Sequence, residues 1–237
     1  MTNVVDDKHG GTNGTVRPPQ SAAHIMTDAN RLTPNNSPPN LVEFNQRIDA
    51  GWCDRPSIQV APELIGCTLF RQLPNGPLIR ATIVETEAYA PGDPACHAYK
   101  GLTKRNAAMF GPPGHSYVYL IYGMYHCLNV VTESSGTGSA VLIRALALDT
   151  LPPNLEPNQT KKPHRVAAGP GKLCRALDID RSLDGKLYAP ENGLWLTHRE
   201  SPVSKEALVQ TTRIGITKAA DKPWRWYLKG HPAVSKV

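Results

Sequence analysis

YVYLIYGMYHCLNVV, residues Tyr117–Val131, is the stretch that decides the fold. Two runs rich in tyrosine, valine, leucine and isoleucine flank the glycine at position 123, and such residues favour β-strands. A glycine between two runs of this kind permits the tight turn of a hairpin. The stretch therefore predicts two antiparallel strands joined at Gly123, with Tyr122 at the tip.

The sequence on either side of this hairpin predicts more strands than helices. Apolar runs bounded by turn residues indicate further strands at residues 67–71, 78–89, 140–148, 194–197, 213–216 and 224–228. Short helices are expected at residues 62–66 and 172–177. This arrangement is typical of a single α+β domain with a curved, mostly antiparallel β-sheet, peripheral helices and a protruding β-hairpin.

Length and composition fit one folded domain that follows an unstructured tail. The chain has 237 residues, of which 40% are hydrophobic, enough for one sizeable core. Residues 1–40 are rich in Asn, Thr, Pro and Gly and poor in large apolar side chains, so we expect them to form a disordered N-terminal tail. Residues 41–237 are expected to form the domain.

The charge pattern fits a polyanionic partner. The chain carries 26 Lys and Arg against 20 Asp and Glu, a formal charge of +6. Residues 94–132 and 157–177 contain no acidic residue at all. Such segments could form one face for the phosphates of a nucleic acid, although scattered solvated lysines would have the same composition.

Cysteines and hydropathy exclude other classes of protein. The five cysteines are odd in number and lack metal-ligand spacing, which argues against a disulfide framework or a structural zinc site. No apolar run approaches the roughly 20 residues that span a bilayer, and the N-terminus lacks the pattern of a signal peptide. We therefore expect a soluble intracellular protein with reduced thiols and no membrane partner.

The strand expected at residues 78–89 carries the first candidates for catalysis. Side chains alternate faces along a strand, so Glu85, Glu87 and Tyr89 share one side. A carboxylate beside an aromatic ring could deprotonate water and stabilise a cationic sugar while the ring stacks on a base. If both carboxylates are buried, a cation such as Arg144 must compensate their repulsion. Two solvated glutamates at an exposed strand edge are the alternative.

Tyrosines cluster in the same half of the chain. Six of the eight lie between Tyr89 and Tyr125, in or beside the longest acid-free stretch. Aromatic rings among positive charges suit stacking on bases, although strand packing explains some of them. Tyr122, at the hairpin tip, could wedge between base pairs and fill the gap left by a flipped nucleotide, or it could fold back on the surface.

Several ordered motifs resemble the alkyladenine (3-methyladenine) DNA glycosylase family. They are ETEAY (85–89), RNxxMF (105–110), YVYxIYGMY (117–125), LxRAL (142–146), GPxKLC (169–174) and RIGI (213–216). The resemblance extends from about residue 55 to the end of the chain. Two departures are a loop before His97 that is one residue shorter than in mammalian members, and His126 in place of an aromatic residue.

The resemblance implies a monofunctional enzyme, in which water rather than a lysine is the nucleophile. Glu87 would be the general base that activates this water for attack at C1′. Arg144 and the backbone carbonyl of Ile214 would help to hold the water. No metal or organic cofactor would be needed.

The resemblance also implies a pocket for a flipped base. Tyr89 would stack on one face of the base, with His97 and Tyr119 on the other. The backbone N–H of His97 would donate to the base edge. Asn129 would disfavour normal guanine by clashing with its exocyclic amino group, and Leu142 would be an apolar neighbour.

Further residues are expected to contact DNA around this pocket. Tyr122 would insert into the minor groove in place of the lost base. The other expected DNA-binding residues are Arg105, Met109, Met124, Tyr125 and Lys172. Met109 would lie beside either the pocket or the DNA surface, and Lys172 would meet a phosphate.

The function that the resemblance implies is base-excision repair by a monomer acting on double-stranded DNA. The enzyme would flip out alkylated or deaminated purines (3-methyladenine, 7-methylguanine, hypoxanthine or ethenoadenine), hydrolyse the N-glycosidic bond and leave an abasic site. A non-catalytic DNA-damage-binding module of the same fold is the second hypothesis, and an unrelated hydrolase of small nucleosides is the third. The expected location is the cytoplasm of a bacterium, at the nucleoid, or the nucleus of a eukaryote.

Overall fold

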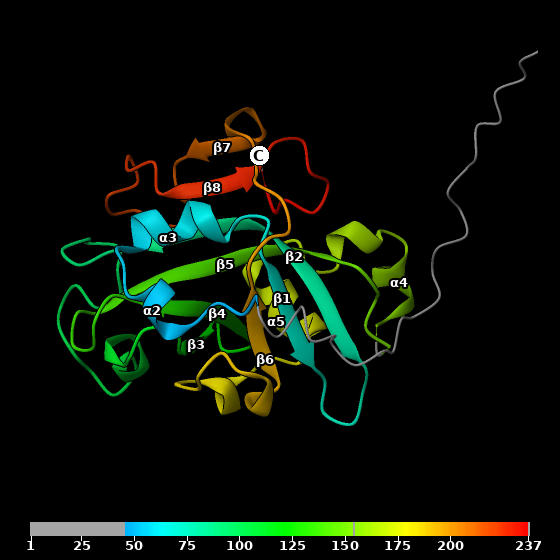
Figure 1. Cartoon of the computed structure of the whole chain (residues 1–237), viewed down its shortest axis with the longest axis horizontal. Coiled ribbons are helices and arrows are strands. Elements are labelled where there is room, and N and C mark those ends of the chain that lie inside the picture. The colour runs from blue at the N-terminus through cyan, green and yellow to red at the C-terminus, as the bar shows by residue number, and fades with distance from the viewer. Residues whose placement is uncertain (1–45, 154, 237) are drawn as a thin grey trace, which may run out of the picture. The chain divides into compact units, whose positions relative to one another are not determined.

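Strand β2 (Leu78–Tyr89) is central to the sheet in this computed structural model (Figure 1). One edge of β2 pairs with β5 (Ser139–Leu148) over most of its length. The other edge pairs first with β1 (Thr68–Gln72) and then with β8 (Arg225–Leu228). Residues 85–87 of β2 therefore lie between two strands, and the exposed strand edge considered as an alternative is excluded.

The remaining strands extend the sheet on both sides. β3 (Ser116–Ile121) and β4 (Tyr125–Thr132) form the expected hairpin beside β5. β6 (Leu194–Thr197) pairs with β1, and β7 (Leu208–Thr211) pairs with β8. Every pairing among these strands is antiparallel, so the prediction of an antiparallel α+β fold is confirmed.

Short helices accompany the sheet. The α-helices of the described residues are α2 (Ala50–Cys53), α3 (Ser57–Leu64), α4 (Pro157–Thr160) and α5 (Pro170–Ala176). The 3₁₀ turns there are η1 (Ala107–Phe110), η2 (Pro163–Arg165), η3 (Arg181–Leu183), η4 (Pro190–Asn192) and η5 (Lys205–Ala207). Helices α3 and α5 begin earlier than the sequence indicated, because a proline at or just before the first turn costs no helical hydrogen bond.

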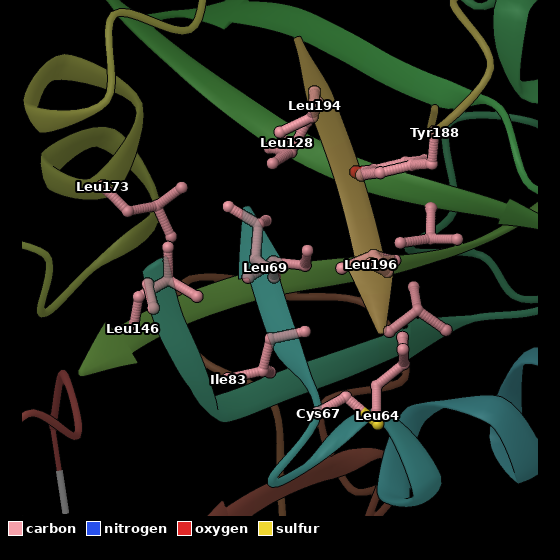
Figure 2. Close-up of a cluster of buried hydrophobic side chains, with 14 of the residues drawn as sticks. Leu64, Cys67, Leu69, Ile83, Leu128, Leu146, Leu173, Tyr188, Leu194 and Leu196 are labelled. Carbon is pink, nitrogen blue, oxygen red and sulfur yellow. The ribbon is translucent and has the colours of Figure 1, made fainter. Parts of the chain in front are cut away.

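The main hydrophobic core joins α3 and α5 to the sheet (Figure 2). Its fully buried members include Leu64 of α3, Leu69 of β1, Ile83 of β2, Leu128 of β4 and Leu173 of α5. Burying one side chain of this size contributes about 1.5–3 kcal/mol. This packing holds β2, and with it the charged residues near its end, in a defined position.

The prediction of a strand at residues 213–216 is wrong. The structure has an irregular loop there, between β7 and β8. Gly215 has a φ of +77°, in the left-handed region that interrupts a strand and favours glycine. The N–H of Ile214 donates to the carboxylate of Glu87 rather than to a neighbouring strand. This segment therefore binds Glu87 and does not add a strand to the sheet.

The structure describes residues 46–153 and 155–236, which all belong to one compact unit. The expected tail at residues 1–40, and its boundary with the domain, lie outside these residues. Within the described ranges, no helix is long and apolar enough to cross a membrane.

Candidate active site

A bulge between β2 and β5 aims the charged side chains of the site. The register between β2 and β5 shifts on either side of Glu85, and the backbone of Arg144 is not paired with any residue of β2. A bulge of this kind bends a strand and redirects its side chains. Arg144 Nε lies 3.2 Å from Oε1 of Glu85, and Arg144 Nη1 lies 3.2 Å from Oε1 of Glu87. The two carboxylates thus share one face of β2, with one cation between them.

Glu87 is fully buried, and three groups stabilise its carboxylate. The N–H of Ile214 donates to Oε1 over 2.8 Å, and the hydroxyl of Tyr89 donates to Oε2 over 2.9 Å. The ion pair with Arg144 is the third contact. Both oxygens of this buried carboxylate therefore have partners, as a buried polar group requires.

Glu85 is buried with a different set of partners. Its Oε1 accepts from Arg144, and from Nε of Arg225 over 2.8 Å, while Oε2 accepts from the N–H of Ser235 over 2.7 Å. Burial would lower the pKa of Arg144, but the charges of Glu87 and Glu85 outweigh burial and raise that pKa. Glu85 therefore positions Arg144 and joins it to the C-terminal segment.

A cavity of about 340 Å³ opens beside these groups. Ligand pockets typically measure about 300–1,000 Å³. Every residue expected to bind the base lines this cavity, namely Tyr89, His97, Tyr119, Asn129, Leu142 and Ile214. Arg144 lines it as well, and Glu87 contacts three of the lining residues.

His97, Tyr117 and Tyr119 form an aromatic wall of the cavity. The rings of His97 and Tyr119 meet edge to face with centroids 4.6 Å apart, and Nδ1 of His97 lies 2.9 Å from the hydroxyl of Tyr117. Burial, and then the charge of Arg105, lower the pKa of His97. Burial also raises the pKa of Tyr119. The wall is therefore uncharged near neutral pH and suits stacking on a base.

Asn129, Leu142 and Met109 are almost fully buried in the lining of the cavity. Asn129 and Leu142 are cross-strand partners on β4 and β5. The Nδ2 of Asn129 donates to the backbone carbonyl of Tyr117 over 2.9 Å, which fixes the amide. Met109 packs with Tyr117 in a small second core. Met109 therefore lies in the wall of the pocket, which is one of the two locations expected for it.

The hairpin tip presents expected DNA-binding residues to solvent. Tyr122 is 83% exposed and Met124 is 68% exposed. Tyr125 is less exposed because it packs on Gly171, where an added Cβ would lie 3.0 Å from the Cβ of Tyr125. Tyr122 also lines the cavity, whereas Met124 and Tyr125 do not.

The two basic residues expected at the DNA surface are both exposed. Arg105 lines the cavity, where its charge acts on His97. Lys172 lies on α5 outside the cavity, directly after the glycine that supports Tyr125. The structure therefore brings Arg105 to the pocket and places Lys172 next to the glycine that packs on Tyr125, near the hairpin tip.

Sequence reasoning missed a buried ion pair behind Tyr89. Both oxygens of Asp93 accept from the guanidinium of Arg213, and both side chains are fully buried. Nη1 of Arg213 also donates to the carbonyl of Ala88 over 3.0 Å. The available signal was Asp93 itself, an isolated acid directly before the longest acid-free stretch. No local pattern identifies its distant partner.

The described residues contain no group of three or more His, Cys, Asp and Glu side chains that could hold a metal ion. All five cysteines are free and buried. One of them, Cys127, lines the cavity, and burial raises the pKa of its thiol.

Comparison with known proteins identifies the family. A family model described as Methylpurine-DNA glycosylase (MPG) matches residues 51–232. The chain belongs to the methylpurine-DNA glycosylase family. The resemblance stated from the sequence motifs is thereby confirmed, and the matched range includes every site residue expected from the sequence.

Curated relatives named "Putative 3-methyladenine DNA glycosylase" resemble this family member over most of its length. One from Trichodesmium erythraeum (strain IMS101) is 58% identical over 198 residues, which are 81% of this chain and 98% of the relative. One from Synechococcus sp. (strain JA-3-3Ab) is 57% identical over 188 residues, 78% of this chain and 96% of the relative. This methylpurine-DNA glycosylase family member is a DNA glycosylase, a hydrolase of DNA repair that acts on DNA.

Proposed function

We propose that this DNA glycosylase removes alkylated and deaminated purines from double-stranded DNA, namely 3-methyladenine, 7-methylguanine, hypoxanthine and ethenoadenine. The enzyme acts as a monomer, at the nucleoid of a bacterium or in the nucleus of a eukaryote, and leaves an abasic site. The observation that carries the proposal is the buried carboxylate of Glu87, held by Tyr89, Ile214 and Arg144 at an aromatic cavity.

The damaged nucleotide is flipped out of the duplex so that its base enters the cavity. Tyr89 stacks on one face of the base, and His97 and Tyr119 lie at the other, which tolerates different purines because every base has a π-face. The N–H of His97 donates to the base edge; in support, it has no hydrogen-bond partner among the described residues. Asn129 disfavours normal guanine by clashing with its exocyclic amino group. 7-Methylguanine keeps this group but is still removed, because its cationic base leaves readily. The amide of Asn129 is held by the backbone carbonyl of Tyr117.

Glu87 acts as the general base for the attacking water. An ionised carboxylate offers about four lone-pair sites. Oε1 faces Ile214 and Arg144, and Oε2 accepts a hydrogen bond from Tyr89 alone among the residues that the structure describes, so Oε2 has room for the water. General-base help of this kind is typically worth about 10²–10⁴-fold in rate. Arg144 and the carbonyl of Ile214 hold the water, and the charge of Glu87 stabilises the cationic sugar.

The leaving base determines how much help the reaction needs. A purine alkylated at N3 or N7 is already cationic and leaves readily. A neutral base such as hypoxanthine needs protonation or hydrogen bonding as it leaves. No lysine lines the cavity in the described part of the chain, which supports water rather than an amine as the nucleophile.

Tyr122 is the wedge that replaces the flipped base in the minor groove. Its φ of +52° is unusual for a bulky aromatic residue and costs of order 1–3 kcal/mol. Asparagine or glycine would adopt this turn with less strain, so a role outside the fold explains the tyrosine better than folding does. Met124 and Tyr125 contact the DNA beside the wedge, and Arg105 and Lys172 meet its phosphates.

Excision from labelled duplexes that each contain one lesion tests the proposal, with an undamaged duplex as the control. Alkali then cleaves the strand at any abasic site, and electrophoresis measures the cleaved fraction. We expect cleavage at the lesion only after alkali treatment, because a monofunctional enzyme does not cut the strand. Duplexes that are bound but never cleaved, or hydrolysis confined to free nucleosides, would contradict the proposal.

A further inference from the structure

Arg213 lies behind the aromatic ring that faces the cavity. Its guanidinium carbon is 4.8 Å from the ring centroid of Tyr89 and 5.2 Å from that of Trp224. The side chain of Arg213 is fully buried, and this residue is not part of the cavity lining, whereas Tyr89 is. The ring of Tyr89 therefore separates the guanidinium from the cavity.

Asp93 compensates the charge of Arg213. The two form a paired contact, with Nη2 of Arg213 lying 3.1 Å from Oδ1 of Asp93. The buried charges around the cavity are three arginines and three carboxylates, which sum to zero: Arg144, Arg213, Arg225, Glu85, Glu87 and Asp93. The Arg213–Asp93 pair makes no ion pair with the other four, so its charge can be altered without removing a partner of Glu87.

We propose that the Arg213–Asp93 pair sets the preference of the enzyme between cationic and neutral lesions, acting through the ring of Tyr89. This inference rests on the proposed function. The face of an aromatic ring attracts a cation through its quadrupole, and a second cation on the opposite face opposes that attraction. The negative charge of Asp93 weakens the repulsion between Arg213 and a cationic base. A 7-methylguanine base enters the cavity with a positive charge and hypoxanthine enters it neutral, so the balance of charge within the pair affects the capture of the two bases differently.

The distances make the effect measurable. A base stacked on the cavity face of Tyr89 lies about 3.5 Å from the ring. The guanidinium lies 4.8 Å away on the other side, so about 8 Å separates it from the base. The guanidinium and a cationic base would be two unit charges about 8 Å apart. At an effective dielectric constant between the value near a protein surface (about 20) and that of water (about 80), removing or adding this interaction changes a rate ratio about three- to tenfold.

The experiment measures single-turnover excision of 7-methylguanine and of hypoxanthine, each opposite cytosine in otherwise identical duplexes, at subsaturating enzyme. The readout is the ratio of the two second-order rate constants, 7-methylguanine over hypoxanthine. We expect Asp93→Asn to lower this ratio about three- to tenfold and Arg213→Gln to raise it by a similar factor. Effects on Glu87 or on the concentration of active enzyme act on both lesions and cancel in the ratio.

Two controls separate charge from structure. Arg213→Lys keeps the charge but loses the paired geometry, so it should slow both reactions and leave the ratio unchanged. The double variant Asp93→Asn/Arg213→Gln restores neutrality and should return the ratio to nearly the wild-type value. Circular dichroism verifies that each variant is folded. The change in the rate ratio of either single variant, Asp93→Asn or Arg213→Gln, is enough to test the proposal if the other variant fails to fold.

The outcomes that overturn this proposal differ from those that overturn the proposed function. Ratios that stay at the wild-type value in folded Asp93→Asn and Arg213→Gln, or that shift in the same direction in both, overturn the role of the pair. An equal loss for both lesions in every variant shows a purely structural pair. A wild-type enzyme that excises neither lesion contradicts the proposed function instead.

Discussion

The hydrogen bond from Tyr89 to Glu87 leads to a prediction that separates two roles of one side chain. Tyr89→Phe removes the hydroxyl and keeps the ring that stacks on the base. The bond is 2.9 Å long, its acceptor is fully buried, and among the described residues it is the only hydrogen bond that Oε2 accepts. A hydrogen bond to a charged group contributes about 1.5–3 kcal/mol. Its loss therefore leaves Oε2 free to move out of position.

The expected effect on the chemical step follows from that free energy. About 1.4 kcal/mol corresponds to a tenfold change in rate, so excision by Tyr89→Phe should be about 10- to 100-fold slower. The affinity for a lesion duplex should stay close to that of the wild type, because the ring and the cavity remain. Tyr119→Phe is the matched control, since the hydroxyl of Tyr119 interacts with Cys127 and not with Glu87.

The assay combines single-turnover excision of hypoxanthine, with enzyme in excess, and fluorescence anisotropy with the same duplex. Tyr119→Phe should excise at nearly the wild-type rate. A wild-type rate for Tyr89→Phe would refute the idea that its hydroxyl holds Glu87. A loss of affinity as large as the loss of rate would assign the hydroxyl to base capture instead.

Three further predictions concern the hairpin, the histidine and the thiols. Tyr122→Ser should speed the return of a flipped ethenoadenine into the duplex, followed by stopped-flow fluorescence, and an unchanged return rate would count against the wedge. Arg105→Gln should raise the pKa of His97 in an NMR titration, because the charge of Arg105 helps to lower it, and an unmoved midpoint would disprove that coupling. In the wild type, the lowered pKa of His97 means that the unfolded chain takes up this proton at a higher pH than the folded protein does. His97 therefore leaves the free energy of unfolding unchanged above the ordinary histidine pKa of about 6.5 and decreases it as the pH falls below that value. Burial raises the pKa of Cys53 to about 12 and that of Cys96 to about 11. Neither thiol should therefore react with a disulfide reagent at pH 8 before the protein unfolds. Rapid reaction of these two thiols in the native protein would contradict this prediction.

The sheet is predictable from the sequence where a local pattern specifies it. The apolar run at residues 78–89 predicts β2 at its observed bounds, and Gly123 predicts the turn of the hairpin. Alternation along β2 also predicts that Glu85 and Glu87 share one face, as their common contact with Arg144 shows. Hydrophobic periodicity and turn residues act over a few positions, so they are readable without the fold.

The rest of the site depends on contacts between residues far apart in the chain. Ile214 and Glu87 are separated by 127 positions, and the segment around Ile214 resembles a strand until that hydrogen bond is known. Asp93 and Arg213 are 120 positions apart, and neither residue alone predicts a buried pair. The bulge that aims Arg144 depends on how β2 and β5 pair. Family motifs located most site residues, and only the fold revealed how they interact.

The central claim is that Glu87 takes a proton from the water that attacks the sugar. Glu87→Gln keeps the shape of the side chain and removes its ability to accept that proton. The decisive measurement is the single-turnover rate constant for hypoxanthine excision by this variant, together with its Kd for the same duplex. The account predicts a loss of rate of at least about 100-fold with an affinity close to that of the wild type. Excision at nearly the normal rate would contradict it.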